Sequence, residues 1–151
     1  MTTKFEVRKS SINYEGVFTL RPILKGAFVL RCKGIVRRGD ELDDVSRIMQ
    51  IGHDRYLVED LRNPHFDDYL NHSCRPNVGF SRGTLALYAL RHIPAESELL
   101  LDYSTTMNEP GWKLRCRCGV ATCRKWIRSF CDLTRQEQLN LRRIALHYLR
   151  A

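Results

Sequence analysis

The chain of 151 residues contains no run of 18 apolar residues, the length that a membrane-spanning helix needs, so we expect no membrane segment. Its first residues, MTTKFEVRKS, lack the apolar stretch of a secretory signal peptide. It also has no internal repeat and no low-complexity stretch, and its composition excludes a collagen-like or wholly disordered protein. We therefore expect an intracellular globular chain of about one domain's length.

The sequence is basic, and its excess charge lies entirely in the last 40 residues. Lys and Arg number 25 and Asp and Glu 17, a formal charge of +8. Residues 1–111 hold 15 of each sign, whereas residues 112–151 hold ten basic and two acidic residues. Clustered arginines attract nucleic acid or another polyanion. One alternative is a solvated basic face. Another is that some of the arginines neutralise metal-bound thiolates, since four thiolates and one Zn²⁺ carry a net charge of about −2.

Short apolar segments bounded by turn residues predict a mainly β protein. Residues 40–54 are acidic and then mixed, which is typical of an insert carrying one or two helical turns. Strands this short and closely spaced favour several small sheets over a doubly wound α/β fold. The expected strands are 5–8, 16–20, 27–31, 34–37, 56–59, 84–90 and 98–103.

The end of the chain carries the strongest helix signal. Thr134 with Glu137 three residues later forms a capping box. Apolar residues then recur at helical spacing, which predicts an amphipathic helix packed on its own domain. A lid or docking helix over a site is the alternative interpretation. The apolar positions are Leu141, Ile144, Ala145, Tyr148 and Leu149.

Three cysteines form a C-x-C-x₄-C cluster at Cys116, Cys118 and Cys123. Three thiolates this close in sequence converge only if the loop wraps a centre, and zinc prefers four tetrahedral ligands. In the absence of a secretory signal, metal binding is a better default for these cysteines than disulfides, although reduced thiols without metal are the alternative. Four thiolates leave no open position, so we expect a structural site. The candidates for the fourth ligand are Cys32, Cys74 and Cys131, with histidines behind them.

Four segments in a fixed order carry a more specific signal. Residues 71–77, NHSCRPN, match the NHSCxPN signature of SET-domain protein-lysine methyltransferases at every fixed position. Residues 93–103, IPAESELLLDY, resemble the I-x-x-GEEL-x-F-D-Y strand of that family, and 116–123 resemble its post-SET zinc motif. Residues 15–26 are similar to its G-x-G-V-F-A…D-I-x-K-G opening. No nucleophile-elbow glycines flank Ser73, which argues against a serine hydrolase.

The resemblance implies a mainly β SET fold (a β-clip), with a pseudoknot in which residues 71–77 and the Tyr103 segment thread past each other. It implies a SET domain over residues 1–109 with an insert at about 38–64 and a post-SET segment at 110–127. The C-terminal amphipathic helix that the capping box predicts then follows at 128–151. It further implies that Cys32 and Cys131 are ordinary thiols. The implied ligands of one structural Zn²⁺ are Cys74, Cys116, Cys118 and Cys123.

The implied activity is methyl transfer from S-adenosylmethionine to the ε-amine of a protein lysine, with Tyr103 as the catalytic tyrosine. The lysine channel is implied to contain Tyr56, Leu101 and Tyr103. The residues implied to bind the cofactor are Glu15, Gly16, Val17, Asn71, His72, Tyr103 and Trp126, with Trp112 as the alternative to Trp126.

Several positions depart from the family pattern, namely Tyr14, Glu96-Ser97, Leu101 and Lys125, and two of them bear on function. Tyr14 stands where the first glycine of G-x-G is usual, which puts the geometry of the cofactor loop in question. Leu101 stands two residues before Tyr103, where Phe or Tyr is usual. Because leucine cannot hold a water by hydrogen bonding, we expect dimethylation or trimethylation to be allowed.

Acidic residues between 40 and 68 are expected to attract a basic peptide such as a histone tail, unless they are merely solvated surface acids. The basic end of the chain is expected to contact nucleic acid or a nucleosome. In a eukaryote the protein would be nuclear or chromatin-bound, and in a prokaryote cytoplasmic. The rival functions are a catalytically silent, zinc-stapled SET-like module that binds peptide or nucleic acid, and a small zinc-containing nucleic-acid-binding protein.

Overall fold

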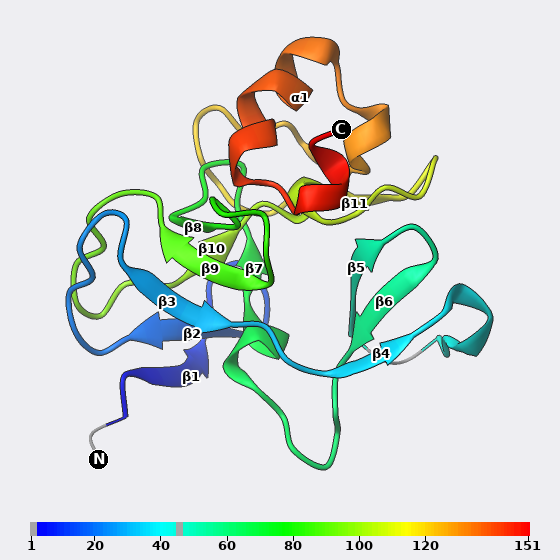
Figure 1. Ribbon diagram of the computed structural model, residues 1–151. Helices are drawn as coiled ribbons and strands as arrows, with labels where there is room; N and C mark the ends of the chain where they lie inside the picture. The colour runs from blue at the N-terminus through cyan, green and yellow to red at the C-terminus, as the bar shows by residue number, and fades with distance from the viewer. Residues whose placement is uncertain (1–2, 45–46) are drawn as a thin grey trace.

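The computed structural model describes residues 3–44 and 47–151 (Figure 1). The part of the expected insert at 45–46, like the first two residues, lies outside the described residues. In the described part, twelve short strands form five small sheets, and the prediction of a mainly β protein is confirmed. No described helix has the length and apolar character needed to cross a membrane.

Four of the sheets are antiparallel. β1 (Phe5–Lys9) pairs with β2 (Glu15–Thr19), and β11 (Lys113–Arg115) pairs with β12 (Trp126–Arg128). A three-stranded sheet has the order β3-β9-β8, with β3 at Phe28–Arg31, β9 at Ala86–Ala89 and β8 at Val78–Gly79. The other has the order β4-β6-β5, with β4 at Ile35–Arg37, β6 at Arg55–Val58 and β5 at Ile48–Gly52.

The fifth sheet joins two distant segments in parallel, β7 (Asn71–His72) and β10 (Leu100–Leu101). Its pairing continues beyond the strands, because the Ser73 N–H donates to the Leu101 carbonyl at 3.0 Å. The Asn77 side chain extends it further, donating to the Glu98 carbonyl and accepting from the Leu100 N–H, both at 2.8 Å. The main hydrophobic core surrounds this crossing, so the signature segment and the strand leading to Tyr103 are fixed together.

The C-terminal helix is shorter than the pattern predicts. The capping box is present, and α1 covers Arg135–Leu141, but 3₁₀ turns at Arg142–Ile144 and His147–Leu149 replace its continuation. The predicted C-terminal helix is therefore present, but it covers only part of residues 128–151. The apolar stripe nevertheless packs on its own domain as predicted, with Leu141, Ala145 and Leu149 buried.

Tertiary hydrogen bonds explain why the helix stops. The Ile144 carbonyl accepts from the Phe80 N–H at 2.9 Å, and the Leu146 N–H donates to the Thr105 carbonyl at 3.0 Å. Both groups are thus committed to other segments and cannot extend an α-helical ladder. Figure 1 shows the resulting group of short turns at the end of the molecule that carries β11.

Candidate active site and metal centre

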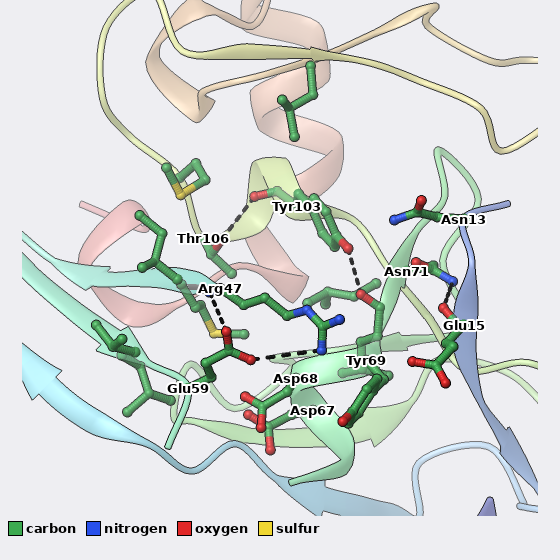
Figure 2. Close-up of a pocket in the computed structure, with 18 of the residues that line it drawn as sticks. Asn13, Glu15, Arg47, Glu59, Asp67, Asp68, Tyr69, Asn71, Tyr103 and Thr106 are labelled. Carbon is green, nitrogen blue, oxygen red and sulfur yellow. Dashed lines mark hydrogen bonds and ion pairs between the residues drawn. The ribbon is translucent and has the colours of Figure 1, made fainter. Parts of the chain in front are cut away.

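A cavity of about 380 Å³ lies between the N-terminal end of β2, the β5–β6 pair and the segment that follows β10 (Figure 2). Its volume is within the range of small-molecule sites. Several residues predicted from the sequence line it together, although they come from separate parts of the chain. These are Glu15, Asn71, Leu101, Tyr103 and Trp112.

Tyr103 begins a 3₁₀ turn, Tyr103–Thr105, that Asp102 caps by accepting the Ser104 N–H at 3.0 Å. Its ring points into the cavity, and its hydroxyl donates to the Leu70 carbonyl at 2.6 Å (Figure 2). Burial raises the pKa of Tyr103 to about 12, so the phenol stays protonated at neutral pH. The site therefore presents a neutral hydroxyl whose proton is already engaged.

Asn71 lies between this phenol and Glu15 of β2 (Figure 2). Its Nδ2 donates to the Glu15 carbonyl and to Glu98 Oε1, both at 2.8 Å, and the Glu98 carboxylate also accepts from the Ser10 hydroxyl. A Cβ atom at Gly16 would come within 2.1 Å of Glu98 Oε1. Glycine at this position thus makes room for the protein's own Asn71–Glu98 pair.

Val17, another predicted cofactor residue, has its side chain fully buried in the main hydrophobic core. Of the residues in β2, Glu15 is exposed and lines the cavity, whereas Val17 and Thr19 are buried. Val17 therefore packs in the core beside the cavity and is not among the residues that line it.

His72 is 4% exposed and lies between Tyr103 and the cysteine cluster. The Tyr103 N–H donates to His72 Nδ1 at 3.1 Å, the two rings meet edge to face at 5.4 Å, and His72 Nε2 is 3.4 Å from Cys74 Sγ. Burial lowers the pKa of His72 to about 4, although the Asp102 carboxylate opposes this shift. The imidazole is therefore neutral at physiological pH.

The four predicted zinc ligands converge. The Sγ atoms of Cys74, Cys116, Cys118 and Cys123 all lie within 4.8 Å of one another, and Cys74 Sγ is 3.7 Å from Cys116 Sγ. Thiolates bound tetrahedrally to zinc at about 2.3 Å lie about 3.8 Å apart, so the donor set fits this metal. The backbone N–H of Arg124 donates to Cys74 Sγ at 3.4 Å, and such bonds stabilise thiolates.

A buried ion pair, which the sequence analysis did not predict, connects the segment that carries Tyr103 with the cysteine cluster. Asp102 is fully buried, and both of its oxygens accept from the Arg124 guanidinium at 2.8 Å. Asp102 precedes Tyr103 and Arg124 follows Cys123. This pair therefore joins the 3₁₀ turn at 103–105 (the tyrosine turn) to the loop at 116–123 that carries three of the four cysteines (the metal loop). A charged residue inside the apolar run LLLDY was the available signal, since a buried carboxylate requires a cationic partner.

Five of the predicted residues do not line this cavity, namely Gly16, Val17, His72, Tyr56 and Trp126. The Tyr56 hydroxyl donates to the Glu109 carboxylate, while the neighbouring Leu57 and Val58 line the cavity. Trp126 lies opposite Arg115 in the β11–β12 register and is 40% exposed.

The hairpin register explains the position of Trp126. Directly paired residues share one face of a hairpin, so Trp126 and Arg115 project from one face, and Leu114 and Ile127 from the other. Leu114 lines the cavity and Ile127 is buried. The Trp126 ring instead contacts cations, with Lys113 Nζ 5.0 Å from its centroid. The cavity wall on this side is therefore formed by Leu114 and Trp112.

Acidic residues gather at the other side of the cavity. The 3₁₀ turn Phe66–Tyr69 contributes Asp67 and Asp68, and β6 is followed by Glu59 (Figure 2). The Arg47 guanidinium lies 4.6 Å from the centroid of the Tyr69 ring, with one of its nitrogens 3.8 Å from a Glu59 oxygen. This side of the cavity therefore already accommodates one cation between an aromatic ring and carboxylates.

Asp67 offers a pH test of this acidic region. Burial and, second, the charge of Asp68 raise the pKa of Asp67 from 3.8 to about 6. The folded chain thus binds a proton that the unfolded chain has released between these values, and stability falls as pH rises through this window. We expect Asp67→Asn to stabilise the protein by about 1–2 kcal/mol at pH 7.5 and to have almost no effect at pH 4.

Urea unfolding at both pH values measures this difference. Asp40→Asn is the matched control, because the Asp40 side chain is 76% exposed and its removal should change stability by less than about 0.5 kcal/mol at either pH. An equal effect of Asp67→Asn at both pH values would contradict the proposed cost of the buried charge.

Comparison with known proteins places this geometry in context. Residues 15–104 match the family model described as SET domain. Human histone-lysine N-methyltransferase 2B is 30% identical over 137 residues, which cover 80% of this chain and 5% of that protein. Histone-lysine N-methyltransferase SUV39H2 of Xenopus tropicalis is 29% identical over 146 residues, covering 74% of this chain and 36% of that protein. The chain thus spans about a third or less of the length of these relatives.

Solved structures share the fold. KRYPTONITE in complex with mCHG DNA and SAH superposes with a TM-score of 0.66 at 25% identity, over 82% of this chain and 29% of that one. The methyltransferase domain of human histone-lysine N-methyltransferase SETMAR superposes with a TM-score of 0.65 at 24% identity, over 83% and 58%. The small-sheet architecture therefore matches both neighbours.

Proposed function

Because the chain belongs to the SET-domain family, we propose that it transfers a methyl group from S-adenosylmethionine to the ε-amine of a protein lysine. One observation carries this proposal: Tyr103, Asn71 and Glu15, which lie in three separate segments, line a single cavity. The names of the relatives as histone-lysine methyltransferases and the SAH bound to KRYPTONITE support it.

The residues around Tyr103 suit the handling of an amine. A lysine has a pKa of about 10.4 and must lose its proton before it can react, and an apolar channel lowers that pKa because burial disfavours the charged form. Leu101, 2% exposed, supplies such a wall. Since the Tyr103 hydroxyl donates to Leu70, its lone pairs remain free to accept from the amine and hold the nitrogen in line with the methyl group.

S-adenosylmethionine supplies an activated methyl group on a sulfonium, and its transfer yields the methylated amine and S-adenosylhomocysteine. We propose that the backbone of Glu15, Gly16 and Val17 and the residues Asn71, His72 and Tyr103 hold it. On the hairpin side Trp112, the alternative to Trp126, lines the cavity.

Tyr14 does not oppose this assignment. Among the described non-glycine residues, only Asp54, Glu96 and Lys125 have positive φ angles, so the backbone of Tyr14 needs no glycine. Its side chain is 88% exposed at the edge of the cavity. The loop can therefore keep its course with a tyrosine at this position.

The identity of Leu101 leads to a prediction about the product. A leucine in the channel cannot hydrogen-bond a water that would occupy the space of a second methyl group. We expect dimethylated and trimethylated lysine to accumulate at saturating cofactor. Mass spectrometry of the product measures this, and a product that stays monomethylated at long reaction times would contradict it.

The charges support a basic protein substrate, with a histone tail as the proposed example and, in a eukaryote, a nuclear or chromatin location. Asp67, Asp68 and Glu59 line the cavity, and the relatives are named for histones. We also propose nucleic-acid contact through the hairpin face that carries Lys113, Arg115 and Trp126, for which the DNA complex of KRYPTONITE gives support.

Two measurements test the proposed function. Calorimetric titration of the zinc-loaded protein with S-adenosylmethionine should show saturable binding. Incubation with labelled cofactor and either histones or a cell lysate, followed by site mapping, should label lysines. A zinc-loaded protein that binds no cofactor would instead favour the silent, zinc-stapled binding module.

A further inference from the structure

The side chain of His72 lies between Tyr103, which lines the cavity, and the cluster of four cysteines. On one side its Nδ1 accepts from the Tyr103 backbone N–H at 3.1 Å, and on the other its Nε2 lies 3.4 Å from Cys74 Sγ. The residue is 4% exposed, so water does not compete for either contact. Both neighbours have roles of their own, since Tyr103 faces the cavity and Cys74 belongs to the thiol cluster.

Geometry fixes which imidazole nitrogen carries the proton. A backbone N–H can only donate, so Nδ1 must present its lone pair to Tyr103. In a neutral imidazole the proton is then on Nε2, where it points at Cys74 Sγ. A metal-bound thiolate is a good acceptor for this proton, and outer hydrogen bonds of this kind orient and strengthen metal ligands.

A parallel connection runs through Arg124. Its backbone N–H donates to Cys74 Sγ at 3.4 Å, while its guanidinium holds Asp102, the residue before Tyr103. Both connections begin at Cys74 and end within one residue of the tyrosine. A displacement of the Cys74 sulfur therefore changes two sets of contacts that fix the start of the Tyr103–Thr105 turn.

We propose that His72 is a positioning residue that couples the cysteine metal centre to Tyr103, so that an occupied zinc site sets the orientation of the tyrosine turn. Its Nε2–H stabilises the Cys74 thiolate, and its Nδ1 holds the Tyr103 backbone. The catalytic part of this inference rests on the proposed methyl transfer, whereas the metal part and the tautomer do not.

Two substitutions separate the two contacts. In His72→Asn the side-chain oxygen can replace Nδ1, but nothing reaches Cys74. In His72→Gln the terminal amide can replace Nε2, but no acceptor faces the Tyr103 N–H. We expect His72→Asn to lower zinc affinity by about 10–100-fold, measured by competition with a chromophoric chelator, and to lower kcat at saturating zinc by less than His72→Gln does.

We expect the opposite pattern for His72→Gln, with zinc affinity kept within about threefold and kcat lowered at least about tenfold, without a matching rise in the KM for cofactor. His92→Gln is the control, because His92 is exposed. Equal losses of both properties in both variants would show that the imidazole only fills space, and no loss in either would remove the coupling.

A measurement on the unaltered, zinc-loaded protein keeps the inference testable if a variant fails to fold. Nitrogen-15 NMR of the imidazole reports the tautomer directly. We expect a protonated Nε2 and an unprotonated Nδ1 in His72. A protonated Nδ1 would overturn the proposal even if methyl transfer is demonstrated, and the expected tautomer would stand even if no transfer is found.

Discussion

Tyr103→Phe is expected to lower kcat by about 100-fold or more while the affinity for S-adenosylmethionine stays within about threefold. The substitution removes only the hydroxyl that donates to the Leu70 carbonyl in the cavity. The ring remains, and with it the edge-to-face contact with His72. The amine therefore loses an acceptor that holds it in line, although the cavity keeps its shape.

Single-turnover methylation and calorimetric titration separate these two effects. The loss of the hydroxyl also leaves the Leu70 carbonyl without its donor, so we expect a stability cost of about 1 kcal/mol. Tyr88→Phe is the matched control, since the Tyr88 ring in β9 packs against Phe28 and Arg82 away from the cavity. Transfer by Tyr103→Phe at nearly the rate of the unaltered protein would disprove the assigned role.

Cys74→Ser is expected to remove the bound zinc and to lower the Tm by about 10 °C or more. Binding of a structural zinc ion contributes several kcal/mol to folding, and each kcal/mol shifts the Tm of a chain of this size by about 2–4 °C. Cys74 differs from the other three ligands in position, because it alone comes from the signature segment and not from residues 116–123. Its loss therefore releases the metal loop from the region of β7.

Zinc content and thermal unfolding with and without a chelator measure this effect. Cys131→Ser is the control, because Cys131 is exposed and lies outside the group of four thiols, and its stability should change by less than about 0.5 kcal/mol. A chelator should lower the Tm of Cys131→Ser as it does for the unaltered protein. It should have little effect on Cys74→Ser. Full zinc content and an unchanged Tm in Cys74→Ser would contradict the four-thiol site.

The two largest effects share a structural origin. Asp102 and His72 connect the tyrosine turn with Arg124 and Cys74, so the cavity and the metal loop are parts of one packed unit. The buried Asp102–Arg124 pair explains why a basic residue directly follows Cys123, the last of the four clustered cysteines. Not all of the basic charge at the C-terminal end is therefore available to a polyanion.

The sequence by itself determined the features that depend on neighbouring residues. The spacing of Cys116, Cys118 and Cys123 and the signature at 71–77 predicted the four cysteines that converge and identified the family, and the short apolar segments predicted small sheets. The capping box at Thr134 also predicted where α1 begins. Such patterns act through local backbone preference and ligand spacing, which few residues are enough to define.

Only the tertiary structure decided which residues face the cavity. The register of the β11–β12 hairpin places Trp126 on the face away from the cavity. The Tyr56 hydroxyl donates to the Glu109 carboxylate. Backbone hydrogen bonds to Phe80 and Thr105 end the C-terminal helix early. Each outcome depends on a partner far away in the chain. Hydrogen bonds and packing between distant segments select one arrangement among several that the local sequence allows, because buried polar groups must be satisfied wherever the fold places them.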